Sequence, residues 1–370
     1  MTIAATALYS PERLARVQDA VRARGLGALL ITPGADLRYV TGYDARQLER
    51  LTCLSVPAKG EPFLLVPALE LKAAQASPAA GLSMDMVAWG ETTDPFEIIS
   101  DRLGSPHSIA LSDRMWALHV LQFARAFPDA EQQLASAIVS PLRMRKTAAE
   151  VNALREAGEV IDRVHASVPN WLRAGRTERE VGAQIAEAII AEGHVSVDFV
   201  IVGSGPNAAS PHHEVSDRVI EAGDVVVVDI GGTMPSGYRS DCTRVYGVGE
   251  PPDDFRTYYE VLRRAQEEAT TSVRPGVTAE SIDAKARDII SGAGYGEWFI
   301  HRTGHGIGLE SHEDPYIVEG NTMPLAAGMA FSIEPGIYPG PHGARIEDIV
   351  VCTDSGYQRL NNAPRDLVIV

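Results

Sequence analysis

The sequence predicts an α/β (α+β) protein of two domains, the second of which is pseudo-symmetric. Three observations support this fold class. The chain has 370 residues, more than one hydrophobic core usually serves. Helical periodicity alternates with short apolar runs over roughly the first 140 residues. Beyond them, two segments repeat the same order of predicted elements. We therefore expect an N-terminal α/β domain over 1–140 and a second domain over 141–370.

The N-terminal domain shows helical spacing first and strand-like runs after it. The strand candidates are apolar and bounded by turn residues, and Lys59-Gly60 suits a hairpin between two of them. The predicted strands are 27–31, 53–57 and 62–67, and the predicted helices are 11–24, 68–76 and 114–127. Residues 140–146 are a plausible hinge before a long helix that begins near Thr147.

The second domain contains a weak internal repeat. The segment Arg173–Thr177 (RAGRT) recurs as Arg274–Thr278 (RPGVT), 101 residues later (274 − 173). Each copy leads into a predicted helix that ends at a glycine, Gly193 or Gly294, as helix C-termini often do. In the first copy, Thr177 and Glu180 form a capping-box pattern.

A further match puts four acidic residues in register. Asp229 follows a run of four valines, and Glu334 occupies the equivalent place 105 residues later (334 − 229). Asp241 corresponds to Glu347 at an offset of 106 (347 − 241). Each half reads helix, helix, strand, strand. Two such halves predict a site between them.

The acidic residues predict a metal site when they are taken together. Singly, each is more often a solvated strand end or part of a local salt bridge. Converging carboxylates need compensation, because unit charges ~4 Å apart repel by roughly 4 kcal/mol at an effective dielectric near 20. One imidazole with four carboxylates suits Mn, Co, Zn or Fe(II). The predicted ligands of two divalent metal ions are Asp229, Asp241, His305, Glu334 and Glu347.

Composition and sequence pattern argue against several other classes of protein. The net charge of −16 disfavours nucleic-acid binding, because an acidic surface repels phosphate. No apolar run approaches the roughly 20 residues of a membrane helix, and the segment MTIAATALYSPERL does not resemble a signal peptide. Three cysteines without a CxxC pair indicate neither a disulfide framework nor a zinc ribbon. We expect a cytoplasmic protein with neither nucleic-acid nor membrane partners.

Four motifs together resemble the pita-bread metallopeptidases of family M24, which include methionine aminopeptidase, aminopeptidase P, prolidase and creatinase. The motifs are Asp229 and Asp241 twelve residues apart, Thr303–Leu309 (TGHGIGL), Ile333–Tyr338 (IEPGIY) and Arg345–Asp348 (RIED). The first 140 residues resemble the creatinase/prolidase N-terminal domain, with Arg38–Gly42 as a weaker hallmark. Methionine aminopeptidase lacks that domain, so the resemblance favours the prolidase and aminopeptidase P branch.

The resemblance implies cleavage of bonds that precede proline, by a water activated between two metal ions. It also implies a homodimer and manganese as the metal. Catalytic roles are implied for His212, His312 and Glu334, with Glu334 relaying a proton to the leaving nitrogen. The neighbouring His213 leaves the position of the first histidine open. The implied substrate-binding residues are His212, His301, His312 and Arg345.

Within this branch we expect an Xaa-Pro dipeptidase acting on Xaa-Pro dipeptides or short peptides. The alternative is an aminopeptidase P that releases the N-terminal residue of longer Xaa-Pro peptides. The choice depends on whether the N-terminal domain blocks the pocket beyond proline. Two other classes stay open: a non-catalytic binding protein, which the complete ligand set disfavours, and a C–N hydrolase of a non-peptide substrate, as in creatinase.

Overall fold

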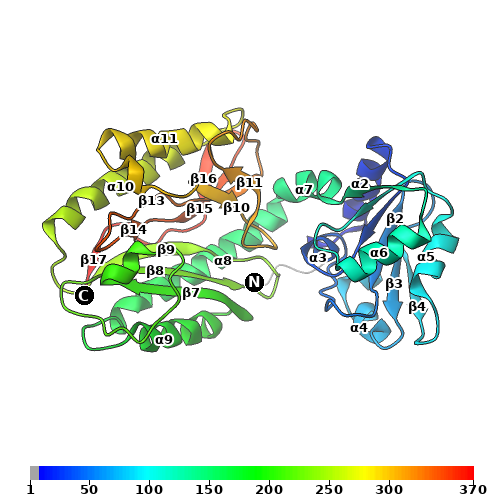
Figure 1. Cartoon of the computed structure of the whole chain (residues 1–370), viewed down its shortest axis with the longest axis horizontal. Helices are drawn as coiled ribbons and strands as arrows, with labels where there is room; N and C mark the ends of the chain where they lie inside the picture. Colours follow the sequence, from blue (N-terminus) through cyan, green and yellow to red (C-terminus); the bar gives the residue numbers. More distant parts are fainter. Residues whose placement is uncertain (1–7) are drawn as a thin grey trace. The chain divides into compact units, whose positions relative to one another are not determined.

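The computed structural model describes residues 8–370, so the start of the segment judged not to be a signal peptide lies outside the described residues. The chain divides into two compact units, Met1–Arg143 and Met144–Val370. The mixed α/β fold class predicted from the sequence is confirmed (Figure 1). None of the helices in the described part is both long and apolar enough to cross a membrane.

The first unit is built on one mixed sheet in the order β4-β3-β2-β1-β5-β6. The predicted hairpin is present, because β2 and β3 pair antiparallel. Its strands are β1 (Ala28–Ile31), β2 (Cys53–Pro57), β3 (Phe63–Pro67), β4 (Asp85–Trp89), β5 (Ser108–Leu111) and β6 (Glu131–Leu134). Its helices are α2 (Pro11–Ala23), α3 (Ala35–Thr41), α4 (Leu71–Gln75), η1 (Pro78–Gly81), α5 (Pro95–Leu103) and α6 (Ala117–Ala126), and α7 (Ser136–Met144) spans the unit boundary.

The second unit has two main sheets, in the orders β17-β9-β8-β7 and β11-β10-β12-β15-β16, and a two-stranded pair, β13-β14. Its helices are α8 (Ala148–Ser167), η2 (Val168–Asn170), α9 (Glu178–Ala191), η3 (Gly205–Ala209), α10 (Asp253–Thr271), α11 (Ala279–Gly292) and η4 (Gly296–Trp298). Its strands are β7 (Ser196–Ser204), β8 (Val225–Thr233), β9 (Cys242–Gly247), β10 (Gly304–Gly306), β11 (Glu313–Ile317), β12 (Ala330–Ile333), β13 (Gly336–Ile337), β14 (Ala344–Arg345), β15 (Asp348–Cys352), β16 (Tyr357–Arg359) and β17 (Val368–Ile369).

Both halves of the internal repeat have more strands than the sequence predicted. The first half runs α8, α9, β7, β8, β9, and the second contains α10, α11, β10, β12, β15 in the same order. The pattern helix, helix, strand, strand was therefore wrong in omitting β7 and β10. A register shift between Val197 and Phe199 interrupts the alternation of β7, and β10 consists of only Gly-His-Gly.

The chain around Glu334 and Glu347 forms interrupted rather than continuous strands. Residues 330–338 divide into β12 and β13 around Pro335, which has no N–H to donate to a neighbouring strand. Residues 345–351 divide into β14 and β15 at Ile346 and Glu347. At the helix ends the predictions hold: Thr177 and Glu180 form the capping box of α9. Gly193 and Gly294 follow α9 and α11 with φ of +123° and +89°.

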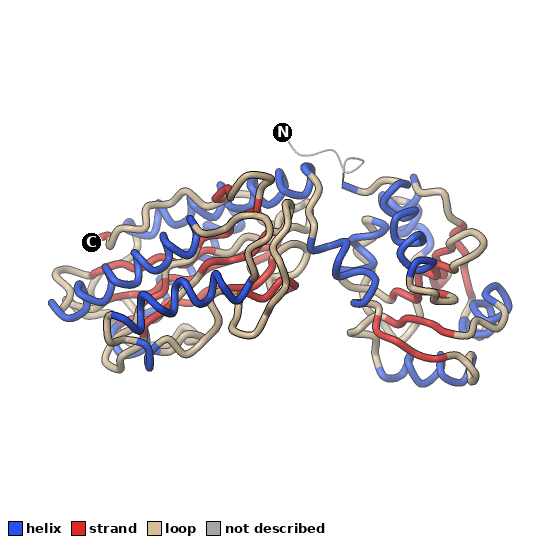
Figure 2. Tube along the Cα trace, turned by 90° about the horizontal axis from the view of Figure 1, so that it is seen from above, coloured by secondary structure: helices blue, strands red, loops and turns tan. Residues whose placement is uncertain are grey.

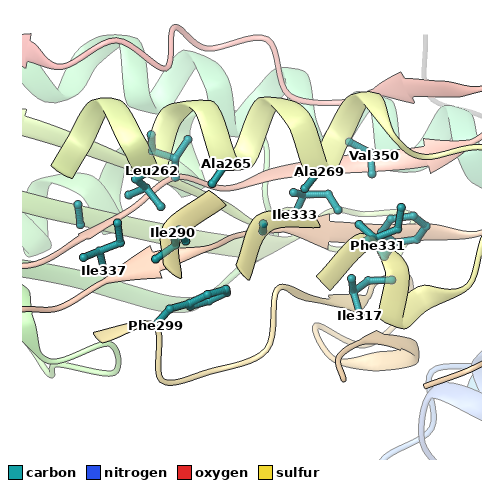
Figure 3. Packing of buried hydrophobic residues seen from close by; sticks show 14 of the residues in the cluster. Leu262, Ala265, Ala269, Ile290, Phe299, Ile317, Phe331, Ile333, Ile337 and Val350 are labelled. Carbon is teal, nitrogen blue, oxygen red and sulfur yellow. The ribbon is translucent and has the colours of Figure 1, made fainter. Parts of the chain in front are cut away.

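Each pair of helices covers its own half of the second unit. In Figure 3, Leu262, Ala265 and Ala269 of α10 pack over Phe331 and Ile333 of β12. A separate cluster joins α8 and α9 to β8 and β9. Figure 2 shows the helices of this unit running alongside its strands.

The two sheets of this unit meet at one backbone contact. Thr243 in β9 and Glu347, just before β15, form an isolated antiparallel bridge. The Glu347 N–H donates to the Thr243 carbonyl oxygen at 3.2 Å. The pseudo-symmetric halves are thus joined beside two of the predicted metal ligands.

Candidate metal centre

Strand alternation turns Asp229 away from α8 and α9. Val226 and Val228 pack in the α8/α9 cluster, whereas Val225 and Val227 belong to the cluster of the other half. Because successive side chains of a strand point to opposite faces, Asp229 lies on the same face as Val225 and Val227. It therefore faces the junction of the two halves.

The same rule places Glu334. Phe331 and Ile333 pack under α10 and α11, so Ser332 and Glu334 point to the opposite side. The Ser332 hydroxyl donates to Oε1 of Glu334 at 3.0 Å and accepts the backbone N–H of His305 at 2.9 Å. Ser332 thus orients two of the predicted ligands together.

Glycine on either side of His305 allows β10 to fit between its neighbours. A Cβ at Gly304 would lie 1.9 Å from the Ser332 carbonyl oxygen, and one at Gly306 would lie 2.2 Å from that of Asp314. No other residue avoids these clashes. Gly304 and Gly306 were predicted to permit a close backbone approach, and they allow β10 to lie between β11 and β12. His305 stands between these glycines and is thereby brought near the carboxylates.

Three of the five predicted ligands meet closely. Asp241, His305 and Glu347 each offer one donor atom, and these atoms all lie within 4.8 Å of one another. Nε2 of His305 lies 3.8 Å from Oδ2 of Asp241 and 3.0 Å from Oε1 of Glu334. Asp241, His305 and Glu347 are at most 5% exposed, and Asp229 is 7% exposed.

The cluster carries more negative charge than its protein surroundings neutralise. Burial, followed by the charge of Asp229, raises the pKa of Asp241 well above its usual value. Burial and the charge of Asp241 do the same to the pKa of Glu347. Burial alone would also raise the pKa of Glu334, but the hydrogen bond from His305 and the positive charges of His305 and Arg345 together outweigh it and lower the value to about 2.

These residues fit divalent metal ions. Oδ1 of Asp229 is buried and has no hydrogen-bond partner among residues 8–370, which is costly unless a cation or another donor contacts it. Crowded carboxylates with one imidazole are oxygen-rich ligands of the kind that Mn, Co, Zn and Fe(II) accept. The raised pKa values of Asp241 and Glu347 show that the negative charge of their carboxylates is not compensated by the protein. A bound cation would compensate it.

The five predicted ligands line a cavity of about 820 Å³. His212, His312 and Arg345 line it too, and Phe199 and Ile201 add an apolar wall. The ring of His312 lies 4.1 Å from that of His305, centre to centre. Burial, followed by the charge of His305, lowers the pKa of His312 to about 4. The neutral ring has one N–H for a substrate oxygen.

Arg345 is largely committed to the protein. Its Nε donates to Thr243 Oγ1 at 3.3 Å, its Nη1 to the Pro211 carbonyl and the Tyr338 hydroxyl, and its Nη2 to Asp229 at 2.5 Å. These bonds use four of the five N–H groups of a guanidinium. Within residues 8–370, one N–H on Nη2 is left for a substrate.

His301 does not line the cavity with the other histidines. Its Nδ1 lies 2.7 Å from the Arg302 carbonyl oxygen, so that nitrogen carries the proton. Burial lowers the pKa of His301, so the ring is neutral and Nε2 accepts from the Tyr338 hydroxyl at 2.9 Å. The structure thus joins His301 to Tyr338, and its direct contact with a substrate stays a prediction.

The structure separates the two adjacent histidines. Nε2 of His213 lies 2.8 Å from Oε2 of Glu178, the first residue of α9. The carbonyl of Pro211, on the other side of His212, accepts from Arg345 at 3.1 Å. Both histidines line the cavity, but the ring of His213 is engaged by Glu178, whereas His212 is held through both of its neighbours. The role of His212 towards a substrate stays a prediction.

Three residues around the site were not predicted: Thr243, Ser332 and Tyr338. Thr243 Oγ1 donates to Oε2 of Glu347 at 2.8 Å. Thr243 and Ser332 each stand two positions from a predicted ligand, Asp241 and Glu334 respectively, and so share a strand face with it. That spacing would have found them. The link from Tyr338 to His301 joins distant segments and has no such signal.

The chain is similar to known proteins over nearly its whole length. Residues 152–354 match the model of metallopeptidase family M24, and residues 13–145 match that of the creatinase/prolidase N-terminal domain. A probable dipeptidase PepE of Mycobacterium tuberculosis is 53% identical over 97% of this chain and 96% of its own length. An Xaa-Pro dipeptidase of Lactobacillus helveticus is 39% identical, over 90% of this chain and 92% of its own.

The fold is similar to that of a solved relative over the whole chain. The crystal structure of dipeptidase PepE from Mycobacterium ulcerans superposes with a TM-score of 0.93 at 52% identity, covering 100% of this chain and 99% of the other. The expected creatinase-type first domain and pita-bread second domain are therefore confirmed.

Proposed function

The chain belongs to metallopeptidase family M24, and we propose that it hydrolyses the peptide bond of Xaa-Pro dipeptides. The observation that carries this proposal is the buried meeting of Asp241, His305 and Glu347 on the wall of a cavity that also holds His212 and His312. Relatives named dipeptidase and Xaa-Pro dipeptidase over nearly the full chain support the substrate class.

Two divalent ions would be held by Asp229, Asp241, His305, Glu334 and Glu347. When bound, such ions lower the pKa of water and polarise a carbonyl group, which is the chemistry that peptide hydrolysis requires. The orphaned Oδ1 of Asp229 and the raised pKa values of Asp241 and Glu347 support this assignment.

The surrounding side chains would bind and orient the dipeptide. The one N–H of neutral His312 would donate to the scissile carbonyl oxygen as negative charge develops there. His212 and the remaining N–H of Arg345 would hold the peptide in line. Glu334, whose low pKa keeps it a carboxylate, would accept a proton from the attacking water. It would pass that proton to the proline nitrogen, so that the C–N bond breaks and the amine leaves.

The apolar wall suits proline. Phe199 and Ile201 line the cavity beside the histidines and offer a surface for a pyrrolidine ring. An Xaa-Pro bond lacks an N–H, so a site that binds it gives up one hydrogen bond and gains apolar contact instead. This contrast makes Ala-Pro and Ala-Ala an informative substrate pair.

Turnover and metal content test the proposal together. We expect the protein loaded with Mn²⁺ to cleave Ala-Pro and E347A to lose activity by at least about three orders of magnitude with reduced metal content. Full activity of E347A would contradict the proposed mechanism. So would stoichiometric metal binding by the wild-type protein with no cleavage of any proline peptide. Creatine serves as the substrate that distinguishes a non-peptide C–N hydrolase.

Chain length of the substrate separates the dipeptidase from the alternative. We expect Ala-Pro to be cleaved faster than Ala-Pro-Ala. Rapid cleavage of the tripeptide with slow cleavage of the dipeptide would instead assign the chain as an aminopeptidase P.

We further propose manganese as the native metal, a homodimer in solution and a cytoplasmic location. The ligand set supports manganese as one of several suitable ions. Metal analysis of protein purified without added metal tests the first proposal, light scattering the second, and fractionation of the source cells the third.

A further inference from the structure

A buried carboxylate outside the metal centre gathers an unusual number of donors. Glu178 is the first residue of α9 and its side chain is 0% exposed. Oε1 accepts from the Ser204 backbone N–H (2.8 Å), the Ser204 hydroxyl (2.7 Å) and the Asn207 amide (3.0 Å). Oε2 accepts from His213 Nε2 (2.8 Å) and from the Ser216 hydroxyl (2.6 Å).

These donors span one loop. Ser204 ends β7 and Ser216 lies where the chain returns to α9, so Glu178 holds both ends of the segment 204–216. Backbone bonds reinforce the return, from the Arg179 N–H to the Ser216 carbonyl oxygen at 3.0 Å. Burial alone would raise the pKa of Glu178, but the bonds from Ser216, Ser204 and His213 lower it to about 2. The group is therefore a carboxylate that only accepts.

His212 lies within this loop, between two anchored neighbours. Because a carboxylate has no proton to give, Nε2 of His213 must donate to Glu178, which fixes the rotamer of His213. Arg345 holds the carbonyl of Pro211 on the other side. The peptide that carries His212 is thus fixed from the α9 side by Glu178 and from the metal side by Arg345.

We propose that Glu178 is a positioning residue of the catalytic site, which fixes His212 towards the substrate by anchoring His213 and the ends of the loop. The proposal rests on the proposed function and adds to it a residue on a helix outside the cavity lining. Because Glu178 bonds to several parts of the loop, a small shift of its side chain also shifts the loop that carries His212. A displacement of a catalytic group by about 1 Å can lower the rate 10²-fold.

The variants E178Q and H213A test the proposal, with E180Q as the matched control. A glutamine at 178 turns an NH₂ group towards donors in either orientation. Glu180 lies on the same helix turn but is exposed, caps α9 and forms a 3.9 Å ion pair with Arg176. We expect kcat on Ala-Pro to fall at least tenfold in E178Q and H213A, with a smaller change in KM. E180Q should stay within twofold. H213Q, which keeps a donor near the position of Nε2, should recover most of the loss.

A double-mutant comparison shows whether Glu178 acts through His212. In an H212A background we expect E178Q to cost less than twofold, because the group that it positions is gone. An equal loss in both backgrounds would overturn the proposal, as would a loss in E178Q that matches its unfolded fraction measured by thermal denaturation.

Hydrogen exchange gives a readout that does not need turnover. We expect amide exchange in 204–216 to rise in E178Q and to be unchanged in E180Q. If the wild-type protein cleaves no Xaa-Pro dipeptide, the proposed function fails. Exchange then decides the anchoring alone, and unchanged exchange in E178Q would overturn it.

Discussion

Nη2 of Arg345 lies 2.5 Å from Oδ2 of Asp229, while Oδ1 of the same carboxylate is buried with no hydrogen-bond partner among residues 8–370. The two oxygens of Asp229 therefore have different surroundings. One is neutralised by a guanidinium of the protein, and the other is left for a cation. Arg345 also donates to Thr243, whose hydroxyl donates to Glu347, so one arginine supports two proposed ligands.

Arg345 is expected to contribute to metal affinity as well as to substrate binding. A lysine at this position keeps the charge but cannot reach Asp229, Thr243 and Tyr338 at once. We expect R345K to bind Mn²⁺ 10- to 100-fold more weakly, the usual range for partners of metal ligands. Isothermal titration of metal-free protein measures this. Unchanged Mn²⁺ affinity with a raised KM would show that Arg345 serves the substrate alone.

Removal of a ligand charge should have opposite effects with and without metal. In metal-free protein, Asp241 is buried beside Asp229, Glu334 and Glu347, so D241N relieves repulsion. We expect D241N in EDTA to be more stable than wild type by at least about 1 kcal/mol, the energy of roughly one pKa unit. Excess Mn²⁺ at 100 times its Kd should stabilise wild type by about 2.7 kcal/mol and D241N by less.

Thermal unfolding in EDTA and in MnCl₂ checks both halves of that expectation. The comparison uses D198N as its control, because Asp198 lines the same cavity but pairs with Arg239 at 2.6 Å rather than with the acidic cluster. Lower stability of D241N than of wild type in EDTA would show that the carboxylates do not repel one another as the structure implies.

The hydroxyl of Tyr338 connects Arg345 to His301. Burial raises the pKa of Tyr338 to about 12, so the hydroxyl keeps its proton and donates it to His301 while it accepts from Arg345. We expect Y338F to lower kcat/KM on Ala-Pro by at least about fivefold, because it removes both hydrogen bonds and each contributes roughly 1 kcal/mol. Steady-state kinetics measure this effect.

A control comes from Tyr238, whose hydroxyl donates to Glu150 at 2.6 Å outside the cavity. Y238F should affect thermal stability and leave kcat/KM within twofold. Equal kinetic losses in Y338F and Y238F would mean that both hydroxyls act only on stability.

The proposed metal ligands could be derived from the sequence because repetition and strand alternation are both visible in it. Asp229 and Glu334 each end an apolar run in corresponding halves, and alternation alone turns both side chains from their helices. His305 was found from its flanking glycines, whose role depends on contacts with Ser332 and Asp314 that only the structure supplies.

The unpredicted parts depend on contacts between distant segments. β10 has three residues and no apolar side chain, so nothing local marks it as a strand; it forms because β11 and β12 pair on either side. Glu178 reads locally as an ordinary acid in the first turn of a helix. Its partners lie 26 to 38 residues away, and no periodicity connects them.

The low pKa of Glu178 makes a definite prediction for acid stability. Its folded value of about 2 lies below the ordinary 4.5, so the folded state holds the carboxylate more strongly than the unfolded chain does. The resulting stability is fully present above pH 4.5 and is lost as the pH falls from about 4.5 towards 2. The contribution is on the order of 3 kcal/mol, since each pKa unit corresponds to roughly 1.4 kcal/mol.

Free energies of unfolding in urea, measured from pH 7 to pH 3 in EDTA, should therefore show a gap between wild type and E178Q that narrows on acidification. E180Q should differ from wild type by a small amount at every pH. A gap that stays constant down to pH 3 would mean that Glu178 stabilises the loop by shape rather than by charge.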